Sequence, residues 1–383
     1  MEFIKKCSIH SHNIISESRR NMNQNKLYKL PINMHPSVKS ECWTFYKLSI
    51  IEALSYDCMA PWMASHLELF FDKEFNAYFG DQFSPYALEY FSGLLDFKEI
   101  DMRSVPAEGC IEYIINEVKN NHYIMTFLPH TKLMIHEVLI RGVDINSKII
   151  YIICFTSGKF QEIPLPFDVF LSEYRKTYDY FSRNAGAKMN YLYVSFPLMR
   201  ISVKKDINLD ICLIGFFNKL TNEINGQILN VEACDENGQV ASGYKYYNGL
   251  ACLLGMEYRL YEYVRDKQFI VGNILAHLSQ KLNLSLLKFY EHRKILYNSL
   301  VWYEQIIGRQ NAEMREYITQ YKNCCLEMEK IYCMAYKFSL TGDWNLFDRI
   351  RAMLKNRYAK EKKILTHIYD MASELYWKNS KRT

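Results

Sequence analysis

The sequence predicts an α+β protein with two domains: the first combines helices with an antiparallel sheet, and the second is mainly helical. Two observations support this prediction. Helical periodicity comes before three short runs of strand-forming residues, and after about residue 207 the pattern becomes almost entirely helical. The chain has 383 residues, 49% of them hydrophobic, which is enough to fill a core in each domain. We therefore expect a loose N-terminal arm at 1–30, an α+β domain at 31–205 and a helical domain at 206–383.

The first part of the chain has three helical patterns after a polar start. Residues 1–30 are rich in Asn and Ser and have little periodicity, which predicts the loose arm. From Cys42 apolar residues recur at helical spacing and predict an amphipathic helix. A second helix is expected at 61–71, because Pro61 suits a first helical turn. A third is expected at about 110–120, where one face carries isoleucine and valine.

Three runs of β-branched, aliphatic and aromatic residues follow, at 122–128, 136–143 and 149–155. The segment 144–148 between the last two has the Asp, Asn and Ser residues of a turn. We expect these runs to form one antiparallel sheet, followed by a helix at 167–178 and a further strand at 191–196.

The second half reads as a series of helices. They are expected at 208–225, 244–265, 269–305, 311–338 and 355–377. Cys324, Cys325 and Cys333 share one of these helices without the spacing of a metal site, so we interpret them as packing residues.

Composition and motifs exclude several classes of protein. The N-terminus lacks the apolar block of a secretory signal, the apolar stretches are too short to cross a bilayer, and 11 cysteines without regular spacing favour reduced thiols. We therefore expect a cytoplasmic protein that does not enter membranes. No phosphate-binding loop, dinucleotide fingerprint or nucleic-acid motif occurs. His136 and Glu137 begin a zincin-like pattern, but position 140 is Ile, so we expect neither a metal nor a cofactor.

Cys42 and His136 are the candidate catalytic residues. Cys42 begins a predicted helix, where the aligned peptide dipoles favour a thiolate, and His136 begins a predicted strand. An imidazole that holds a thiolate as an ion pair is what a cysteine nucleophile requires. The alternative is structural: Cys42 would be a small buried residue, and His136 a strand residue held by a backbone hydrogen bond.

The context of these two residues resembles a known family. The segment 41–50, in which Cys42 begins the helix, and the predicted hairpin of 129–144 and 149–155 resemble the butirosin biosynthesis protein H-like family of natural-product clusters. The resemblance covers roughly residues 35–200, and segment 237–263 is similar to the C-terminal part of that family. It implies a papain-like N-terminal domain related to C39 peptidases.

The resemblance also implies a reaction. In this family an acyl group passes from a carrier-protein thioester to an amine, so Cys42 would attack the thioester and His136 would take up and return protons. The implied partners are an acyl or peptidyl carrier protein and a small-molecule amine acceptor. The other hypotheses are a catalytically inactive papain-like scaffold that binds a carrier protein or pathway enzyme, and, third, a cysteine peptidase.

Two departures from related domains bear on activity. The region 152–155, where an acidic residue would fix the imidazole, offers no carboxylate, and Asp144 belongs to the turn. The glutamine that commonly precedes the nucleophile is missing from 36–40. We therefore expect a Cys-His dyad in which a neutral group or water orients His136.

The end of the chain is basic. From Trp344 onward it carries ten Lys and Arg against four Asp and Glu. This pattern is typical of a solvated helix face, and the alternative is a docking surface for an acidic carrier protein. The candidate docking residues are Arg349, Arg351, Lys355, Arg357, Lys362 and Lys363.

Overall fold

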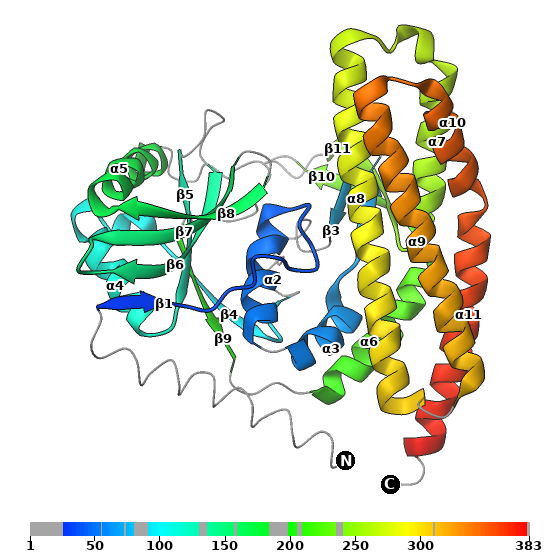
Figure 1. Cartoon of the computed structure of the whole chain (residues 1–383), viewed down its shortest axis with the longest axis horizontal. Helices are drawn as coiled ribbons and strands as arrows, with labels where there is room; N and C mark the ends of the chain where they lie inside the picture. The colour runs from blue at the N-terminus through cyan, green and yellow to red at the C-terminus, as the bar shows by residue number, and fades with distance from the viewer. Residues whose placement is uncertain are drawn as a thin grey trace. The chain divides into compact units, whose positions relative to one another are not determined.

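The chain divides into two compact units (Figure 1). The computed structural model describes residues 26–54, 56–72, 74–79, 91–129, 136–156, 159–183, 198–204, 209–234, 240–308 and 311–380. Unit 1 comprises Met1–Met59 and Asp81–Leu209, and unit 2 comprises Ala60–Gly80 and Asp210–Thr383. The α+β class, the antiparallel sheet and the helical C-terminal region are as predicted. Residues 60–80 differ from the prediction, because they fold with unit 2 although the sequence assigns them to the first domain.

In the described part of unit 1 the strands form a seven-stranded antiparallel sheet. Its spatial order is β4 (Leu95–Ile100), β9 (Leu198–Val203), β5 (Tyr123–Leu128), β6 (His136–Asp144), β7 (Ile149–Thr156) and β8 (Lys159–Pro166). A short strand, β1 (Leu27–Lys29), pairs with the end of β6 that β5 does not reach. The three predicted runs are therefore the centre of the sheet.

The last residues of the predicted N-terminal arm are not loose, because they form strand β1 (Leu27–Lys29). Leu27 pairs with Asp144, and Tyr28 with Val143. This pairing requires Gly142, since a Cβ atom there would lie 2.8 Å from the main-chain oxygen of Tyr28. The earlier residues of the predicted arm, 1–25, lie outside the described residues.

Two strands of unit 1, β4 and β8, were not predicted from the sequence, because they lack a continuous run of apolar strand-forming residues. Strand β4 is largely solvent-accessible, and β8 contains Pro164 and Pro166. Proline cannot donate to a sheet ladder and is confined to edge strands, which is the place of β8. The strand predicted at 191–196 lies outside the described residues, and β9 begins at Leu198.

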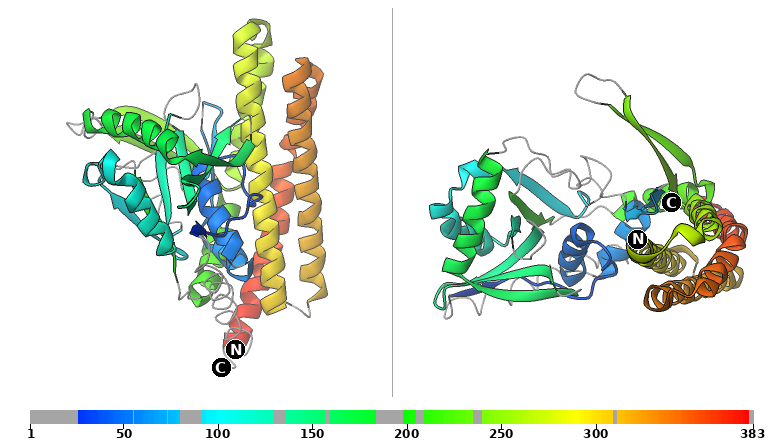
Figure 2. Two further views of the ribbon diagram at one scale, coloured as in Figure 1. Left: turned by 60° about the vertical axis from the view of Figure 1, so that its left-hand side comes forward. Right: turned by 90° about the horizontal axis from the view of Figure 1, so that it is seen from above.

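Helices lie on both sides of the unit 1 sheet. In Figure 1 and Figure 2, α4 (Cys110–Lys119) and α5 (Phe167–Arg183) lie on one side and α2 (Cys42–Leu54) lies on the other. The prediction of an amphipathic helix from Cys42 is wrong, because residues 43–51 of α2 are all buried. A helix that is buried on every side holds its first residue in a fixed place.

Unit 2 contains a second antiparallel sheet, with the order β10 (Ile228–Cys234), β11 (Val240–Asn248), β2 (Leu69–Asp72) and β3 (Ala77–Phe79). The helix predicted at 61–71 is present only up to His66, and its bounds are wrong: α3 (Tyr56–His66) contains Pro61 in its interior, and β2 begins three residues after α3 ends. Phe71 pairs with Tyr247 of β11, and this long-range pairing places 60–80 in unit 2.

Six helices complete the described part of unit 2. They are α6 (Leu209–Asn225), α7 (Ala251–Arg265), α8 (Gly272–Tyr303), α9 (Ala312–Thr341), α10 (Trp344–Lys355) and α11 (Arg357–Ser380). Figure 2 shows the long helices α8 and α9 side by side. The predicted helix at 244–265 is wrong at its start, because β11 runs to Asn248. Gly249, with a φ of 54°, then makes the turn into α7.

The interior of unit 2 buries a network of charges. The carboxylate of Glu361 accepts hydrogen bonds from Arg293 Nε at 3.3 Å and from Arg357 Nε at 2.9 Å. Glu223 Oε2 lies 3.7 Å from His292 Nε2, and all of these side chains are at most 4% exposed. Such a network stabilises the fold only while each charge keeps its partner.

Among the described residues, no helix combines the length and apolar character that are needed to span a bilayer.

Candidate functional site

Helix α2 fixes the position of Cys42. The main-chain oxygen of Glu41 accepts a hydrogen bond from Phe45 N–H at 2.8 Å, so the helical hydrogen bonds begin directly before Cys42. Cys42 is the first helical residue and is half-buried. The first N–H groups of a helix have no partner within the helix, and they favour negative charge next to them. The sequence therefore places the thiol where a thiolate is stabilised.

Strand β6 fixes the position of His136. His136 is the first residue of β6 and pairs with Leu128 at the end of β5. Its side chain is 31% exposed, and its Nε2 lies 3.7 Å from Cys42 Sγ. The prediction that the fold brings these two residues together is confirmed.

The other ring nitrogen of His136 identifies the tautomer. Nδ1 lies 3.1 Å from the main-chain oxygen of Glu137. A carbonyl oxygen can only accept, so Nδ1 carries the hydrogen and donates it, and the lone pair of Nε2 faces the Cys42 thiol. A neutral main-chain group thus helps to orient the imidazole, which is one part of the prediction.

Tyr46 holds the same carbonyl in place. Its hydroxyl donates to the main-chain oxygen of Glu137 at 2.9 Å. Tyr46 is completely buried, and burial raises the pKa of its hydroxyl well above the ordinary value, so it stays a donor. Cys42 and Tyr46 are one helical turn apart, and α2 therefore fixes both the thiol and the support of the imidazole.

A carboxylate also lies beside the imidazole, where the sequence analysis expected none. Glu137 Oε2 is 3.4 Å from His136 Nδ1, and its side chain is 6% exposed. Burial raises the pKa of Glu137, while the neighbouring His136 lowers it. The acid was expected in the region 152–155 of the next strand, because related domains have it there. The sequence feature that could have predicted this carboxylate is Glu137, which directly follows His136.

Aromatic side chains pack around the start of α2. Phe45 stacks on Phe160 of β8 with ring centroids 3.5 Å apart, and Tyr46 meets the edge of the same ring at 5.8 Å. Phe155 of β7 also contacts Phe160 and is 38% exposed. Strand β8, which the sequence did not predict, therefore supplies an apolar neighbour for the helix that carries Cys42.

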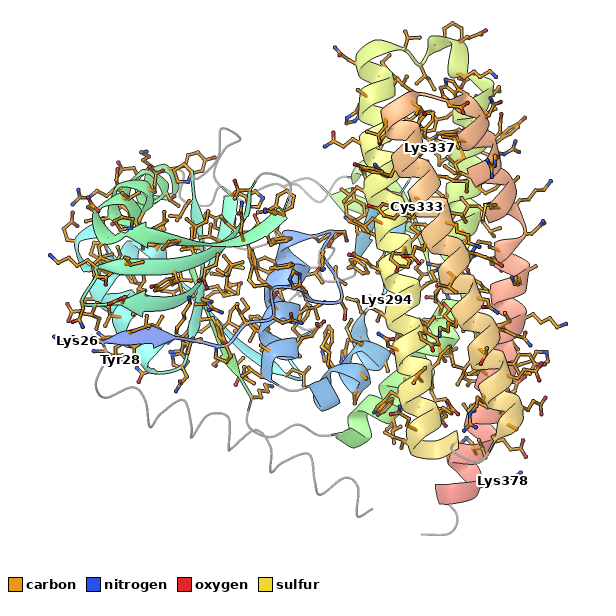
Figure 3. The ribbon with its side chains drawn as sticks, viewed as in Figure 1. Lys26, Tyr28, Lys294, Cys333, Lys337 and Lys378 are labelled. Atoms are coloured by element: carbon orange, nitrogen blue, oxygen red, sulfur yellow. The ribbon has the colours of Figure 1, made fainter. Side chains whose placement is uncertain are left out.

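The other described cysteines differ from Cys42 in their surroundings. Cys154 is a buried core residue, and burial raises the pKa of its thiol to about 11. Burial likewise raises the pKa of Cys110 to about 12. Cys324 and Cys325 pack in the core, but the packing role predicted for Cys333 is wrong, because Cys333 is exposed on α9 (Figure 3).

Cys42, His136 and Glu137 also form a possible set of metal ligands. Within the described part of the chain, the thiol sulfur, a ring nitrogen and a carboxylate oxygen of these residues lie within 4.8 Å of one another. No metal was expected here, because the zincin-like pattern that begins at His136 lacks its second histidine.

The basic segment at the end of the chain is partly neutralised. Arg357 is 2% exposed and binds Glu361 and Glu327, so its place in the predicted docking surface is wrong. Arg351 pairs with Glu257 at 3.0 Å. The candidates that are exposed are Arg349, Lys355 and Lys363.

Comparison with known proteins gives no match, either to a protein-family model or to a curated protein sequence.

Proposed function

We propose that this protein is a cysteine-dependent acyltransferase that moves an acyl group from a carrier-protein thioester, through Cys42, to an amine acceptor. The observation that carries the proposal is the distance of 3.7 Å between Cys42 Sγ and His136 Nε2, with Nδ1 held by a carbonyl oxygen. This geometry gives the thiol a proton acceptor and places the sulfur at a helix N-terminus.

The chemical steps follow from these positions. The Cys42 thiol gives its proton to His136 Nε2, and the thiolate attacks the thioester carbonyl. The first N–H groups of α2 are near the oxyanion that forms. The C–S bond to the carrier then breaks, and the carrier sulfur takes the proton from Nε2. An amine attacks the acyl-Cys42 thioester and gives its proton to Nε2, and this proton returns to the Cys42 sulfur as the amide is released.

The Glu137 carboxylate supports the first of these steps. Proton transfer to Nε2 creates an imidazolium, and a carboxylate oxygen 3.4 Å from Nδ1 stabilises that charge. The absence of an acid from the region 152–155 would by itself favour an inactive scaffold. A carboxylate next to the ring removes that argument and favours the enzyme.

The choice of acyl transfer and of a papain-like unit 1 rests on the resemblance to the butirosin biosynthesis protein H-like family. A cysteine at the start of a helix that faces a histidine at the start of a sheet strand supports it. A carrier-bound thioester is more activated than an amide, so acyl transfer from it demands less of the Cys42–His136 pair than peptide hydrolysis does.

Intact-protein mass spectrometry with an acyl-loaded carrier protein tests the proposal. The acyl group should move to the chain and map to Cys42, and Cys42→Ala should abolish the adduct. Cys333→Ser is the matched control, because it removes an exposed thiol and should leave the adduct unchanged. Carrier binding without an adduct in the wild-type chain would favour the scaffold instead.

A further inference from the structure

We propose that Cys42, His136 and Glu137 bind a zinc ion, and that zinc reversibly closes the site by occupying the thiol. The inference concerns regulation of the site of the proposed function. Only its consequence for acyl transfer rests on that function, because metal binding can be measured without any acyl donor.

The donor atoms fit zinc in type and spacing. Zinc binds Cys sulfur, His nitrogen and carboxylate oxygen, whereas Ca²⁺ and Mg²⁺ prefer oxygen alone. With Zn–S and Zn–N bonds of about 2.3 and 2.0 Å, a tetrahedral ion holds its sulfur and nitrogen ligands about 3.5 Å apart. Cys42 Sγ and His136 Nε2 are 3.7 Å apart, so an ion could bridge them with little movement.

The second ring nitrogen is already arranged for metal binding. A histidine that ligates zinc donates its other N–H to a carbonyl or carboxylate, which fixes the ring and the tautomer. His136 Nδ1 has this partner in the Glu137 carbonyl, and Tyr46 anchors that carbonyl. The lone pair of Nε2 is therefore presented toward Cys42 before any ion arrives.

The Glu137 carboxylate supplies an independent observation. Its Oε2 is buried and lies 3.4 Å from His136 Nδ1, and the carboxylate also interacts with the Cys42 side chain. A buried carboxylate is costly unless its charge is compensated, and coordination to a cation would offset that cost. Glu137 belongs to the group whose ligand atoms lie within 4.8 Å, so it is the third ligand.

Zinc binding and acyl transfer through Cys42 exclude each other at this site. Zinc takes the sulfur lone pair of Cys42 and the Nε2 lone pair of His136, and the thiol proton passes to the buffer. The sulfur can then attack neither a thioester nor an alkylating reagent. Three protein ligands leave the fourth position to water, so a chelator can reach the ion.

Zinc binding and thiol protection test the inference on the full chain. After treatment with a chelator, the wild-type chain should take up one zinc ion in equilibrium dialysis. Zinc should slow iodoacetamide labelling of Cys42, as read by peptide mapping, at least tenfold. Cys333 on α9 is the internal control, because it is exposed and should be labelled equally with and without zinc. Equal protection of both thiols, or no bound zinc, would overturn the inference.

Two variants and a second metal sharpen the test. Glu137→Gln should weaken zinc binding by about tenfold or more, whereas Glu112→Gln, at an exposed position on α4, should leave it unchanged. Cobalt should give a thiolate charge-transfer absorption in the wild-type chain and none in Cys42→Ser, and this readout does not depend on how Glu137→Gln folds. Unchanged zinc affinity in a folded Glu137→Gln variant would contradict the assignment.

The two proposals can fail separately. An acyl adduct that forms in the presence of a chelator, together with no zinc protection, would leave the acyltransferase proposal in place and overturn the zinc site. Zinc protection without any acyl adduct would do the opposite.

Discussion

Tyr46 donates its hydroxyl hydrogen to the main-chain oxygen of Glu137 at 2.9 Å, and the same oxygen accepts the Nδ1–H of His136. One carbonyl therefore links the helix that carries Cys42 to the ring that faces it. Tyr46 acts on the imidazole through this carbonyl, which makes Tyr46 a positioning residue.

Removal of the Tyr46 hydroxyl should lower the reactivity of Cys42. Tyr46→Phe loses one buried hydrogen bond, worth about 1 kcal/mol, and His136 becomes less firmly oriented. We expect the rate of Cys42 alkylation at neutral pH to fall roughly fivefold, which corresponds to that energy. Circular dichroism should show that the secondary structure is kept.

Tyr174→Phe is the matched control. Tyr174 is also buried in unit 1, and its hydroxyl donates to the main-chain oxygen of Val105 at 3.0 Å. This variant should lose similar stability but leave the alkylation rate unchanged. Equal rates for Tyr46→Phe and Tyr174→Phe would show that the Tyr46 hydrogen bond is only structural.

The sequence was sufficient for the centre of the unit 1 sheet. Strands β5, β6 and β7 are adjacent in sequence as well as in space, and their composition and turn are local signals. Strands β4 and β9 pair across about a hundred residues, and β2 pairs with β11 across a longer stretch. No local pattern encodes such pairings, which is why residues 60–80 were assigned to the wrong domain.

In the candidate site, too, only the features with a local sequence signal could be predicted. The pairing of Cys42 with His136 could be predicted, because a helix start and a strand start are visible in the sequence. The position of Glu137 could not be, because strand alternation places neighbours on opposite faces, and His136 is the first residue of its strand. The support from Tyr46 depends on the packing of α2 against β6, which sequence periodicity does not report.

Neutralising Glu361 should strongly destabilise unit 2. Its carboxylate lies between Arg293 and Arg357, and all three side chains are at most 2% exposed. Glu361→Gln would leave these guanidinium groups undercompensated in the interior, at a cost of about 3 kcal/mol. Thermal melting should show this loss.

The control is Lys378→Ala, which breaks an exposed pair with Glu374 and should cost less than about 0.5 kcal/mol. Equal effects would mean that the buried network adds little.

The stability of unit 2 should depend on pH through Glu223. Burial raises its pKa to about 7, although Arg293 and Lys219 lower it, and a neutral His292 lies 3.7 Å away. Because the folded pKa is above the ordinary value of 4.5, the stability that Glu223 contributes is complete below that pH and is lost as the pH rises through about 7.

Glu223→Gln removes this titration. Relative to the variant, the wild-type chain should lose up to about 3 kcal/mol of unfolding free energy between about pH 5 and pH 8. Melting curves of both proteins across this range measure the difference, with Glu374→Gln as an exposed control. A wild-type chain that gains stability relative to Glu223→Gln over the same range would contradict the assignment.

Carrier-protein binding should depend on the exposed basic residues of α10 and α11. Carrier proteins are typically acidic, and Arg349, Lys355 and Lys363 remain exposed after the ion pairs of this segment are accounted for. Reversing these three charges should weaken binding at least tenfold and flatten its salt dependence, because exposed charges are screened within about 8 Å at physiological ionic strength. The matched control reverses three exposed lysines of α8 and α9: Lys294 and Lys337, which Figure 3 labels, and Lys330. Titration calorimetry at two salt concentrations measures both effects. Equal weakening by the two triple variants would show that only the net charge of the chain matters. Unchanged carrier affinity in both variants would mean that the carrier binds at another surface.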